Sequence, residues 1–370
     1  MATSSTVRFN KDDQPEFFQV LRKRVNQHFS DKGITKYGDG RMVFKTVFMV
    51  SLYAVPLLLL LSGLVQATWA IVLMWVLMAL GMSGIGFSVM HDANHGAYSP
   101  NPKVNSALGG ILNFVGGYHI NWKIQHNVLH HSYTNVHEHD EDIDKGIFRL
   151  SPDQEHKPFY RFQIIYAPIL YGMMTIFWLV AKDFLQTRDY HKRGLLEAQG
   201  VSYGSAMTYV VLLKIAYVAI TLVLPIMILP LAWWQTLLCF LMMHFISGLF
   251  LALVFQGAHV LEETHFFKTN EHGSVENSWA VHQLKTTANF ANGRHFFAWF
   301  IGGLNHQVEH HLFPNICHIH YPDIAPIVKA TAEEYGIPYY EHPTFLAALR
   351  SHFRMLYKLG NNKYERQLAA

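Results

Sequence analysis

Residues 69–95 read WAIVLMWVLMALGMSGIGFSVMHDANH, an apolar stretch that runs directly into a histidine pair. Residues 69–90 contain no Asp, Glu, Lys or Arg, and a membrane-spanning helix needs about 20 apolar residues. His91 follows at once, and His95 lies four residues further on. Side chains four residues apart share one face of a helix. The stretch therefore predicts a membrane helix that presents two imidazoles, the commonest metal ligands in proteins.

Three more stretches of this kind flank the first. No Asp, Glu, Lys or Arg lies between Lys45 and His91, or between Lys214 and Glu262. Each of these two gaps is long enough for two spans. We predict membrane-spanning helices at residues 42–64, 69–90, 206–229 and 233–256.

The distribution of charge predicts the topology. The turns inside both pairs of spans carry no charge, whereas the charged segments all lie at the opposite ends of the spans. The segment before the first span contains Arg22, Lys23, Arg24 and Arg41, so the positive-inside rule places that side in the cytoplasm. We therefore expect an all-α integral membrane protein. Four transmembrane helices would form two hairpins, and a cytoplasmic helical cap would carry a histidine-rich di-metal site.

The predicted organisation has three parts and two shorter apolar segments. The parts are a cytoplasmic N-terminal leader (1–41), a membrane domain (42–320) and a cytoplasmic C-terminal helical segment of the same domain (321–370). Residues 104–120 are too short to cross a bilayer, and we expect a re-entrant or interfacial segment there. Residues 162–181 are interrupted by Pro168 and Gly172, which favours an interfacial helix over a fifth span.

The composition excludes several classes of protein. Hydrophobic residues make up 51% of the chain and charged residues 15%, whereas about a quarter of a soluble globular domain is charged. The net charge of +3 comes without a basic stripe interleaved with aromatics, so we expect no nucleic-acid partner. Two cysteines are too few for a disulfide framework or a thiolate metal cage.

Histidine is the residue type that points to chemistry. The chain has 24 histidines, and three clusters repeat a four-residue spacing: HDANH at 91–95, HNVLHH at 126–131 and HQVEHH at 306–311. A further histidine follows the fourth span. All lie at the predicted cytoplasmic ends of spans. The candidate ligands are His91, His95, His126, His130, His131, His259, His306, His310 and His311.

Nine imidazoles are too many for one metal ion. They would suit two ions, each with coordination positions left open for oxygen. Zinc does not change its redox state, so iron fits better beside a lipid phase. The expected substrate beside a lipid phase is a methylene chain. Such a chain has no acidic proton and no electrophilic carbon, so acid–base groups cannot attack it. The sequence therefore indicates an O2-dependent oxidation of a lipid chain.

At these clusters the chain resembles the membrane fatty acid desaturase family. The clusters match the family's three histidine boxes, and the segments His139–Asp144, His259–Thr264, Gly302–Asn305 and Leu312–Pro314 look like the family as well. The resemblance implies two non-haem irons and an enzyme that desaturates an acyl-CoA or acyl-lipid chain with O2.

The third box carries a further resemblance. Gln307 stands where stearoyl-CoA desaturases have a histidine, which resembles the front-end branch that contains the linoleoyl-CoA (delta-6) desaturases. Which of His306 and Gln307 ligates the metal stays open. Three residues separate His126 from His130, as in bacterial-type members. The leader lacks the His-Pro-Gly-Gly motif of a fused cytochrome b5, so we expect a separate donor: ferredoxin, rubredoxin or cytochrome b5.

Two other functions and several single residues complete the analysis. The same scaffold suits a lipid hydroxylase or ketolase, and a divalent-metal transporter is a distant alternative. A transporter would need ionisable residues deep in the spans, where the sequence offers little beyond Lys214 and His244. We expect His244 to be packed and hydrogen-bonded, and Lys214 either to be functional or to snorkel to the interface. The acidic run 138–144 is interpreted as a solvated loop.

Overall fold

The computed structural model describes residues 7–144, 146–293 and 295–364. Within them the chain is mostly helical and forms two compact units. We refer to Gly38–Ile124 with Pro168–Ala252 as the membrane unit, and to Met1–Tyr37, Gln125–Ala167 and Leu253–Ala370 as the histidine unit. The first six residues of the predicted leader and the last six of the predicted C-terminal segment lie outside the described residues. The predicted division into three parts stays a prediction.

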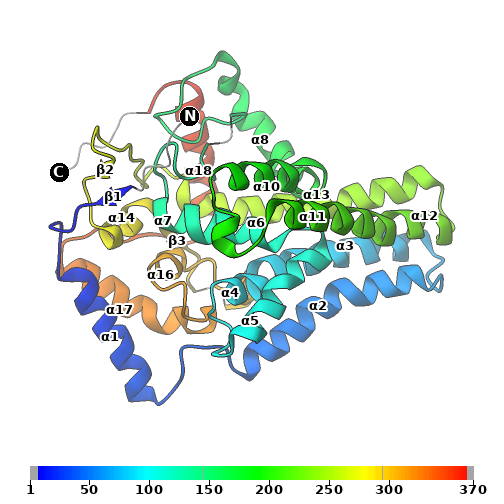
Figure 1. Ribbon diagram of the computed structural model, residues 1–370, viewed down its shortest axis with the longest axis horizontal. Coiled ribbons are helices and arrows are strands. Elements are labelled where there is room, and N and C mark those ends of the chain that lie inside the picture. Colours follow the sequence, from blue (N-terminus) through cyan, green and yellow to red (C-terminus); the bar gives the residue numbers. More distant parts are fainter. Residues whose placement is uncertain (1–6, 145, 294, 365–370) are drawn as a thin grey trace. The chain divides into compact units, whose positions relative to one another are not determined.

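The four apolar helices that the sequence predicts are all present (Figure 1). They are Gly40–Leu61, Thr68–Asn94, Tyr203–Ile228 and Trp233–His259, each long and apolar enough to cross a membrane. Their ends lie within four residues of the predicted ends. A helix of 27 residues rises about 40 Å, which exceeds the roughly 30 Å of a bilayer's hydrocarbon core. The second and fourth helices are therefore long enough to reach beyond the hydrocarbon, and both end in histidine-bearing turns.

The membrane unit contains three of these spans, most of the fourth and several short helices. Its elements are α2 (Gly40–Leu61), α3 (Thr68–Gly84), η1 (Ile85–Val89), α4 (Met90–Asn94), α5 (Pro102–Gly109), η2 (Gly110–Val115), α6 (His119–Lys123), α9 (Met174–Phe177), η5 (Trp178–Lys182), α10 (Asp183–Lys192), η6 (Glu197–Gln199), α11 (Tyr203–Val218), η7 (Ala219–Val223) and α12 (Leu224–Ile228). The predicted segment 104–120 corresponds to α5, η2 and the start of α6. Three elements contain a boundary between the units: η3 (Ile124–His130), α8 (Gln163–Gly172) and α13 (Trp233–His259).

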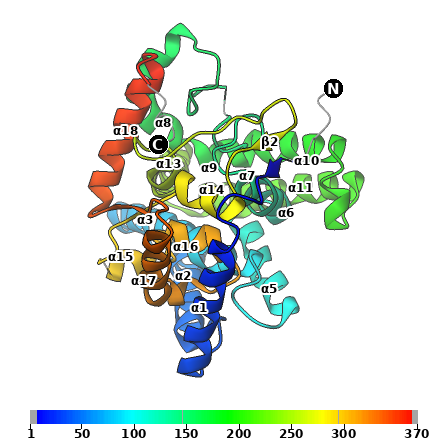
Figure 2. The ribbon, with the colours of Figure 1, turned by 90° about the vertical axis from the view of Figure 1, so that its left-hand side faces the viewer.

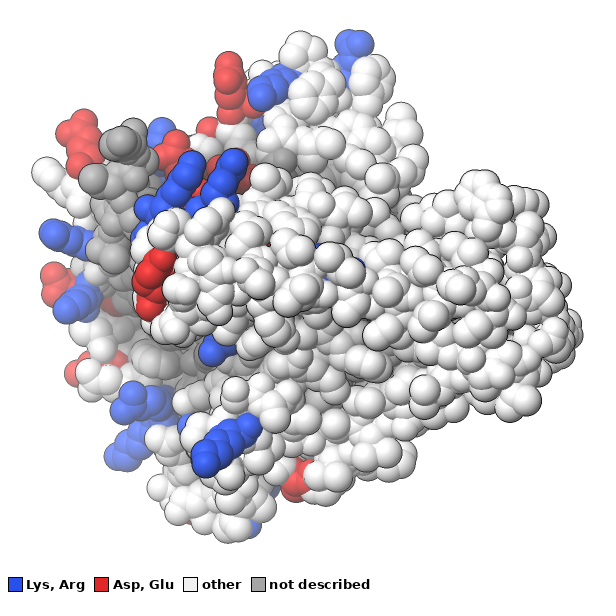
Figure 3. Space-filling model, turned by 45° about the vertical axis from the view of Figure 1, so that its right-hand side comes forward, with Lys and Arg blue, Asp and Glu red and all other residues white. Residues whose placement is uncertain are grey.

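Apolar side chains cover the outside of the spans. Leu58, Trp69 and Met227 are 64%, 73% and 75% exposed, and the space-filling view shows a broad surface without Lys, Arg, Asp or Glu over the ends of these helices (Figure 3). Contiguous exposed apolar surface of this extent is unfavourable in water and suited to lipid tails. The unit is thus built to face a bilayer.

The predicted interfacial segment 162–181 is a bent helix pair. Pro158–Gly172 and Met174–Lys192 meet at an angle of 60°, which suits a broken span or a re-entrant loop. Glycines allow the close packing beside the bend. A Cβ on Gly172 would clash with the ring of Phe245, and a Cβ on Gly248 would lie 2.6 Å from the Gly172 carbonyl oxygen. Whether this segment spans or lies in the interface stays a prediction.

The histidine unit packs short helices around its own hydrophobic core. Its elements are β1 (Arg8–Phe9), α1 (Phe17–Lys32), α7 (His131–Tyr133), η4 (Pro158–Phe162), β2 (Ser274–Val275), α14 (Trp279–Thr286), β3 (Ala288–Phe290), α15 (His295–Phe300), α16 (Gln307–Leu312), η8 (His318–His320), α17 (Tyr321–Glu334), β4 (Tyr340–His342) and α18 (Phe345–Gly360). Leu21 and Val25 of α1 are fully buried in the same core cluster as Val328 of α17, and the two helices lie side by side (Figures 1 and 2). The parallel strand pairs β1–β2 and β3–β4 were not predicted.

Several buried polar groups inside the membrane unit have partners. Lys214 is buried, donates to the Gly116 carbonyl oxygen at 2.6 Å and forms a very short ion pair with Asp183. Asp183 also accepts a hydrogen bond from the Tyr118 amide at 3.0 Å. Lys214 therefore does not snorkel, and that interpretation was wrong. His244 lies 3.2 Å from the Tyr217 hydroxyl, which confirms its predicted packed and hydrogen-bonded role.

The ion pair predicts a specific pattern of stability. Lys214→Met leaves the Asp183 carboxylate buried without its cation, which should cost about 3–5 kcal/mol, whereas Lys214→Met with Asp183→Leu should recover most of that loss. Thermal unfolding of the purified protein in detergent measures both. Lys192→Met, at an exposed lysine of α10, is the matched control. A melting temperature of Lys214→Met equal to that of the control would contradict the pairing.

Candidate metal centre

The second histidine box owes its geometry to a π turn. In an α-helix, residues five apart point about 140° away from each other. Here η3 (Ile124–His130) is π-helical and leads into α7, and its wider turn brings Nε2 of His131 to 3.2 Å from Nε2 of His126. Such turns often occur at functional sites. All three histidines of this box are buried.

The third box begins α16 after a turn that only glycine fits. Gly302 and Gly303 have φ values of 64° and 68°, a region that side chains with a Cβ rarely adopt. A Cβ on Gly303 would also lie 2.9 Å from the Cβ of His318. The turn sets the direction of α16, which carries His310 and His311 into the interior, each at most 1% exposed.

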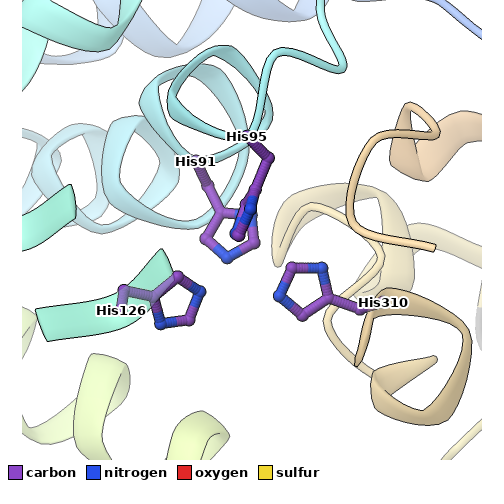
Figure 4. Close-up of side chains that lie close together, drawn as sticks. All are labelled: His91, His95, His126 and His310. Atoms are coloured by element: carbon purple, nitrogen blue, oxygen red, sulfur yellow. The ribbon is translucent and has the colours of Figure 1, made fainter. Parts of the chain in front are cut away.

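These boxes form two groups inside the histidine unit. In the first group, Nε2 of His131 lies 3.2 Å from that of His126 and 2.9 Å from that of His310. Figure 4 shows the rings of His126 and His310 facing each other, from η3 and α16, with centroids 5.7 Å apart. A single proton on Nε2 of His131 can bridge to Nε2 of His126 or to Nε2 of His310, but not to both.

The second group consists of His130, His259 and His311, which offer ligand atoms within 4.8 Å of one another. His259 is the last residue of α13. The two groups are neighbours, because the rings of His131 and His311 stack with centroids 4.3 Å apart. Six predicted ligands from three distant parts of the sequence thus come together.

Fixed acceptors set the tautomer of the second group. Nδ1 of His130 lies 3.1 Å from Asp140, Nδ1 of His259 lies 3.3 Å from the Thr286 carbonyl oxygen, and Nδ1 of His311 lies 2.8 Å from Oε1 of Gln283. These oxygens accept, so each Nδ1 carries the proton and donates it. Each Nε2 then keeps its lone pair, which is the arrangement of metal-binding histidines.

The first box lies in the membrane unit. His91 and His95 both project from the end of the second span, at α4 and its C-cap (Figure 4), with ring centroids 4.9 Å apart. The ring of Trp122 contacts both, at 5.5 Å and 6.1 Å. The π turn η1 (Ile85–Val89) directly precedes this box. The predicted pair is therefore presented together from one helix end.

His306 and Gln307 are buried at the start of α16. Within the described residues neither ring nitrogen of His306 makes a hydrogen bond, and Nδ1 lies 3.7 Å from Glu309. Glu309 accepts hydrogen bonds from Asn289 and Tyr339, both at 2.8 Å. Burial and the Glu309 carboxylate raise the pKa of Tyr339 well above its ordinary value, which keeps this donor protonated. The roles of His306 and Gln307 as metal ligands stay predictions.

Several supporting residues escaped the sequence analysis. Asp140 is fully buried and accepts from His130 and from the Asn135 amide, so interpreting all of the run 138–144 as a solvated loop was wrong. Its position ten residues after His130 was the available signal. Gln283 gave none, because its partner His311 is distant in sequence. His282 donates to the Thr134 carbonyl oxygen at 2.7 Å, and burial lowers its pKa to about 4, so it is neutral.

The donor set fits iron. Imidazole suits iron, copper, nickel and zinc, and metal–nitrogen bonds of about 2.1 Å at right angles place their nitrogens about 3 Å apart, as in the first group. In the second group, Nε2 of His259 is buried, and the side chain of Gln307 lies close to this ring. Convergent buried lone pairs are costly without a cation. The arrangement of these histidines is therefore suited to binding a metal.

Comparison with known proteins identifies close similarities. A family model described as "Fatty acid desaturase" matches residues 67–343. The sn-1 linoleoyl-lipid 6-desaturase of Synechocystis sp. is 36% identical over 97% of this chain and 99% of its own. The Arthrospira platensis protein of that name is 33% identical over 98% of this chain and 96% of its own. An acyl-lipid (8-3)-desaturase of Physcomitrium patens is 32% identical over 97% of this chain and 75% of its own.

The buried carboxylate behind His130 yields a direct prediction. Asp140→Asn keeps the size of the side chain but removes the charge that holds the His130 tautomer, so the affinity for ferrous iron should fall roughly 10–100-fold. Titration against a competing chelator measures this. Glu138→Gln removes the same charge from an exposed position of the same loop and should bind iron like the parent. Equal affinities for both variants would contradict the assigned role.

Proposed function

The chain belongs to the fatty acid desaturase family, and from that premise we propose that it inserts a cis double bond into an acyl-lipid chain with O2 and two electrons. We further propose a front-end, delta-6-like reaction on a linoleoyl chain. Two relatives that match nearly the whole chain are named sn-1 linoleoyl-lipid 6-desaturase. Gln307 in the third box supports the same branch. The acyl-CoA substrate stays the alternative to the acyl lipid.

The proposed centre holds two irons. His126, His131 and His310 would contribute to one part of the ligand set and His130, His259 and His311 to another. On the family's box pattern, His91 and His95 of the first box would complete it, with His306 or Gln307 as a further ligand. The support is the matched tautomers of the second group, the close nitrogens of the first and the family's box pattern. Bound iron would supply the oxidation of unactivated C–H bonds with O2.

The protein's own residues have three tasks in this reaction. Asp140, Gln283 and the Thr286 carbonyl oxygen hold the imidazoles in their ligating tautomer. The apolar spans bind the acyl chain and exclude water. The methylene groups of an acyl chain are chemically alike. The position in which the protein holds the chain beside the metals therefore decides which two neighbouring carbons lose hydrogen.

The proposal places the histidine clusters on the cytoplasmic face, with the four spans in two hairpins. The support is the basic charge of the segment before the first span, which the positive-inside rule assigns to the cytoplasm. A separate electron donor in the cytoplasm would then have access to the centre. The one observation that carries the function most is the pair of buried histidine groups in a chain of this family.

Product analysis tests the function. Expression in a host whose lipids contain linoleoyl chains should yield a polyunsaturated product with one more double bond, located at carbon 6, as for the relatives so named. Mass spectrometry after derivatisation of the double bonds locates it.

His311→Ala removes a ligand of the second group and should abolish the product, whereas His272→Ala removes an exposed histidine and should leave it. A hydroxylated or ketolated product, or no product from iron-loaded protein with a reduced donor, would contradict the proposal.

A further inference from the structure

A groove of ≈ 720 Å³ runs along one face of α1 in the histidine unit. It is lined by Phe18, Gln19, Arg22, Lys23, Asn26, Gln27 and Ser30. The opposite face of α1 is buried against the core at Phe17, Leu21 and Val25. Of the lining side chains, Phe18 packs against this core, and the other six are polar or charged and are not part of it.

The groove is positively charged. Arg22 and Lys23 are exposed, and neither has an ion-pair partner within the described residues. Arg24, by contrast, binds Glu334 of α17 at 2.7 Å and helps to hold α1 in place. No Asp or Glu appears among the lining residues that the structure describes. A cationic groove of this kind favours an anionic partner.

A short path of contacts connects the groove with the metal centre. The ring of Phe18, at the groove, meets the ring of Trp279 edge to face with centroids 5.4 Å apart. The indole Nε1 of Trp279 donates to the carbonyl oxygen of His131 at 3.4 Å. His131 is the central residue of the first histidine group. Phe18 also contacts Phe313, which follows the third box, at 5.9 Å.

We propose that the α1 groove is the docking surface for an acidic one-electron carrier protein, and that Phe18 and Trp279 carry its electrons toward His131. The proposal rests on the desaturase function. Desaturation converts –CH2–CH2– and O2 into –CH=CH– and two waters. The reaction also consumes two electrons and two protons, so two molecules of the reduced one-electron carrier are oxidised in each turnover. A transient redox contact needs only a small, charged interface.

The charge argument is tested by rapid mixing. An acidic [2Fe–2S] ferredoxin, reduced beforehand, is mixed without O2 with the iron-loaded full-length protein, and its re-oxidation is followed by absorbance. Arg22→Glu with Lys23→Glu should slow the bimolecular step roughly tenfold or more at low salt, because steering charges raise association rates by that order. The difference should shrink as ionic strength rises.

Two controls separate this proposal from the function itself. Lys157→Glu with Arg161→Glu makes the same charge change at exposed positions of another surface and should leave the rate unchanged. A photoreduced deazaflavin, which needs no docking surface, should reduce the centre of the groove variant at the parental rate. A centre that the deazaflavin reduces but that forms no product with O2 and substrate would count against the function, not against the groove.

The aromatic path has its own variant. Trp279→Phe keeps a ring beside Phe18 but removes the indole N–H, so it should lower the electron-transfer rate at saturating ferredoxin and leave ferredoxin binding unchanged. Equal slowing by both double charge reversals, or no effect of the groove variant, would overturn the docking surface. An unchanged saturating rate in Trp279→Phe would overturn the path.

Discussion

Three buried histidines must each donate an Nδ1 proton to a fixed acceptor, and the arrangement of the histidine unit depends on this constraint. Asp140 comes from the loop after α7, whereas Gln283 and Thr286 come from α14. A buried imidazole is costly unless its polar atoms are satisfied. The acceptors satisfy one nitrogen of each ring and turn the other toward a common point. The packing of α13, α14 and α16 is therefore coupled to the metal centre.

Buried polar atoms of the membrane unit also need hydrogen-bond partners, because a bilayer offers little water to satisfy them. Many of its outward side chains are apolar, and the buried side chains of Lys214, Asp183 and His244 are paired inside the unit. Lys214 and Asp183 hold one another beside the turn before α6, and α6 carries Trp122 against the first histidine box. The ion pair thus helps to fix the backbone from which the box-contacting ring projects. Its value to the protein is geometric, because a buried pair adds little net stability.

Much of this arrangement was predictable because it depends on local pattern. The charge-free stretches located all four candidate spans, and the spacing of the boxes identified six candidate ligands that do meet in the histidine unit. The parts that escaped prediction depend on distant partners or on unusual backbone. Gln283 has no marker in its own neighbourhood, and the π turn that unites His126 with His131 cannot be distinguished from an α-helix by spacing alone. The sequence could not decide whether Lys214 is functional or snorkels, because its partner Asp183 lies 31 residues away.

The central claim is that these imidazoles hold two irons in one centre. Mössbauer spectroscopy of the purified full-length protein loaded with ⁵⁷Fe tests it most directly, together with an iron count. The account predicts two irons per chain that are magnetically coupled in the oxidised protein, with parameters of nitrogen-rich ligation. A single iron per chain, or two irons without magnetic coupling, would contradict it.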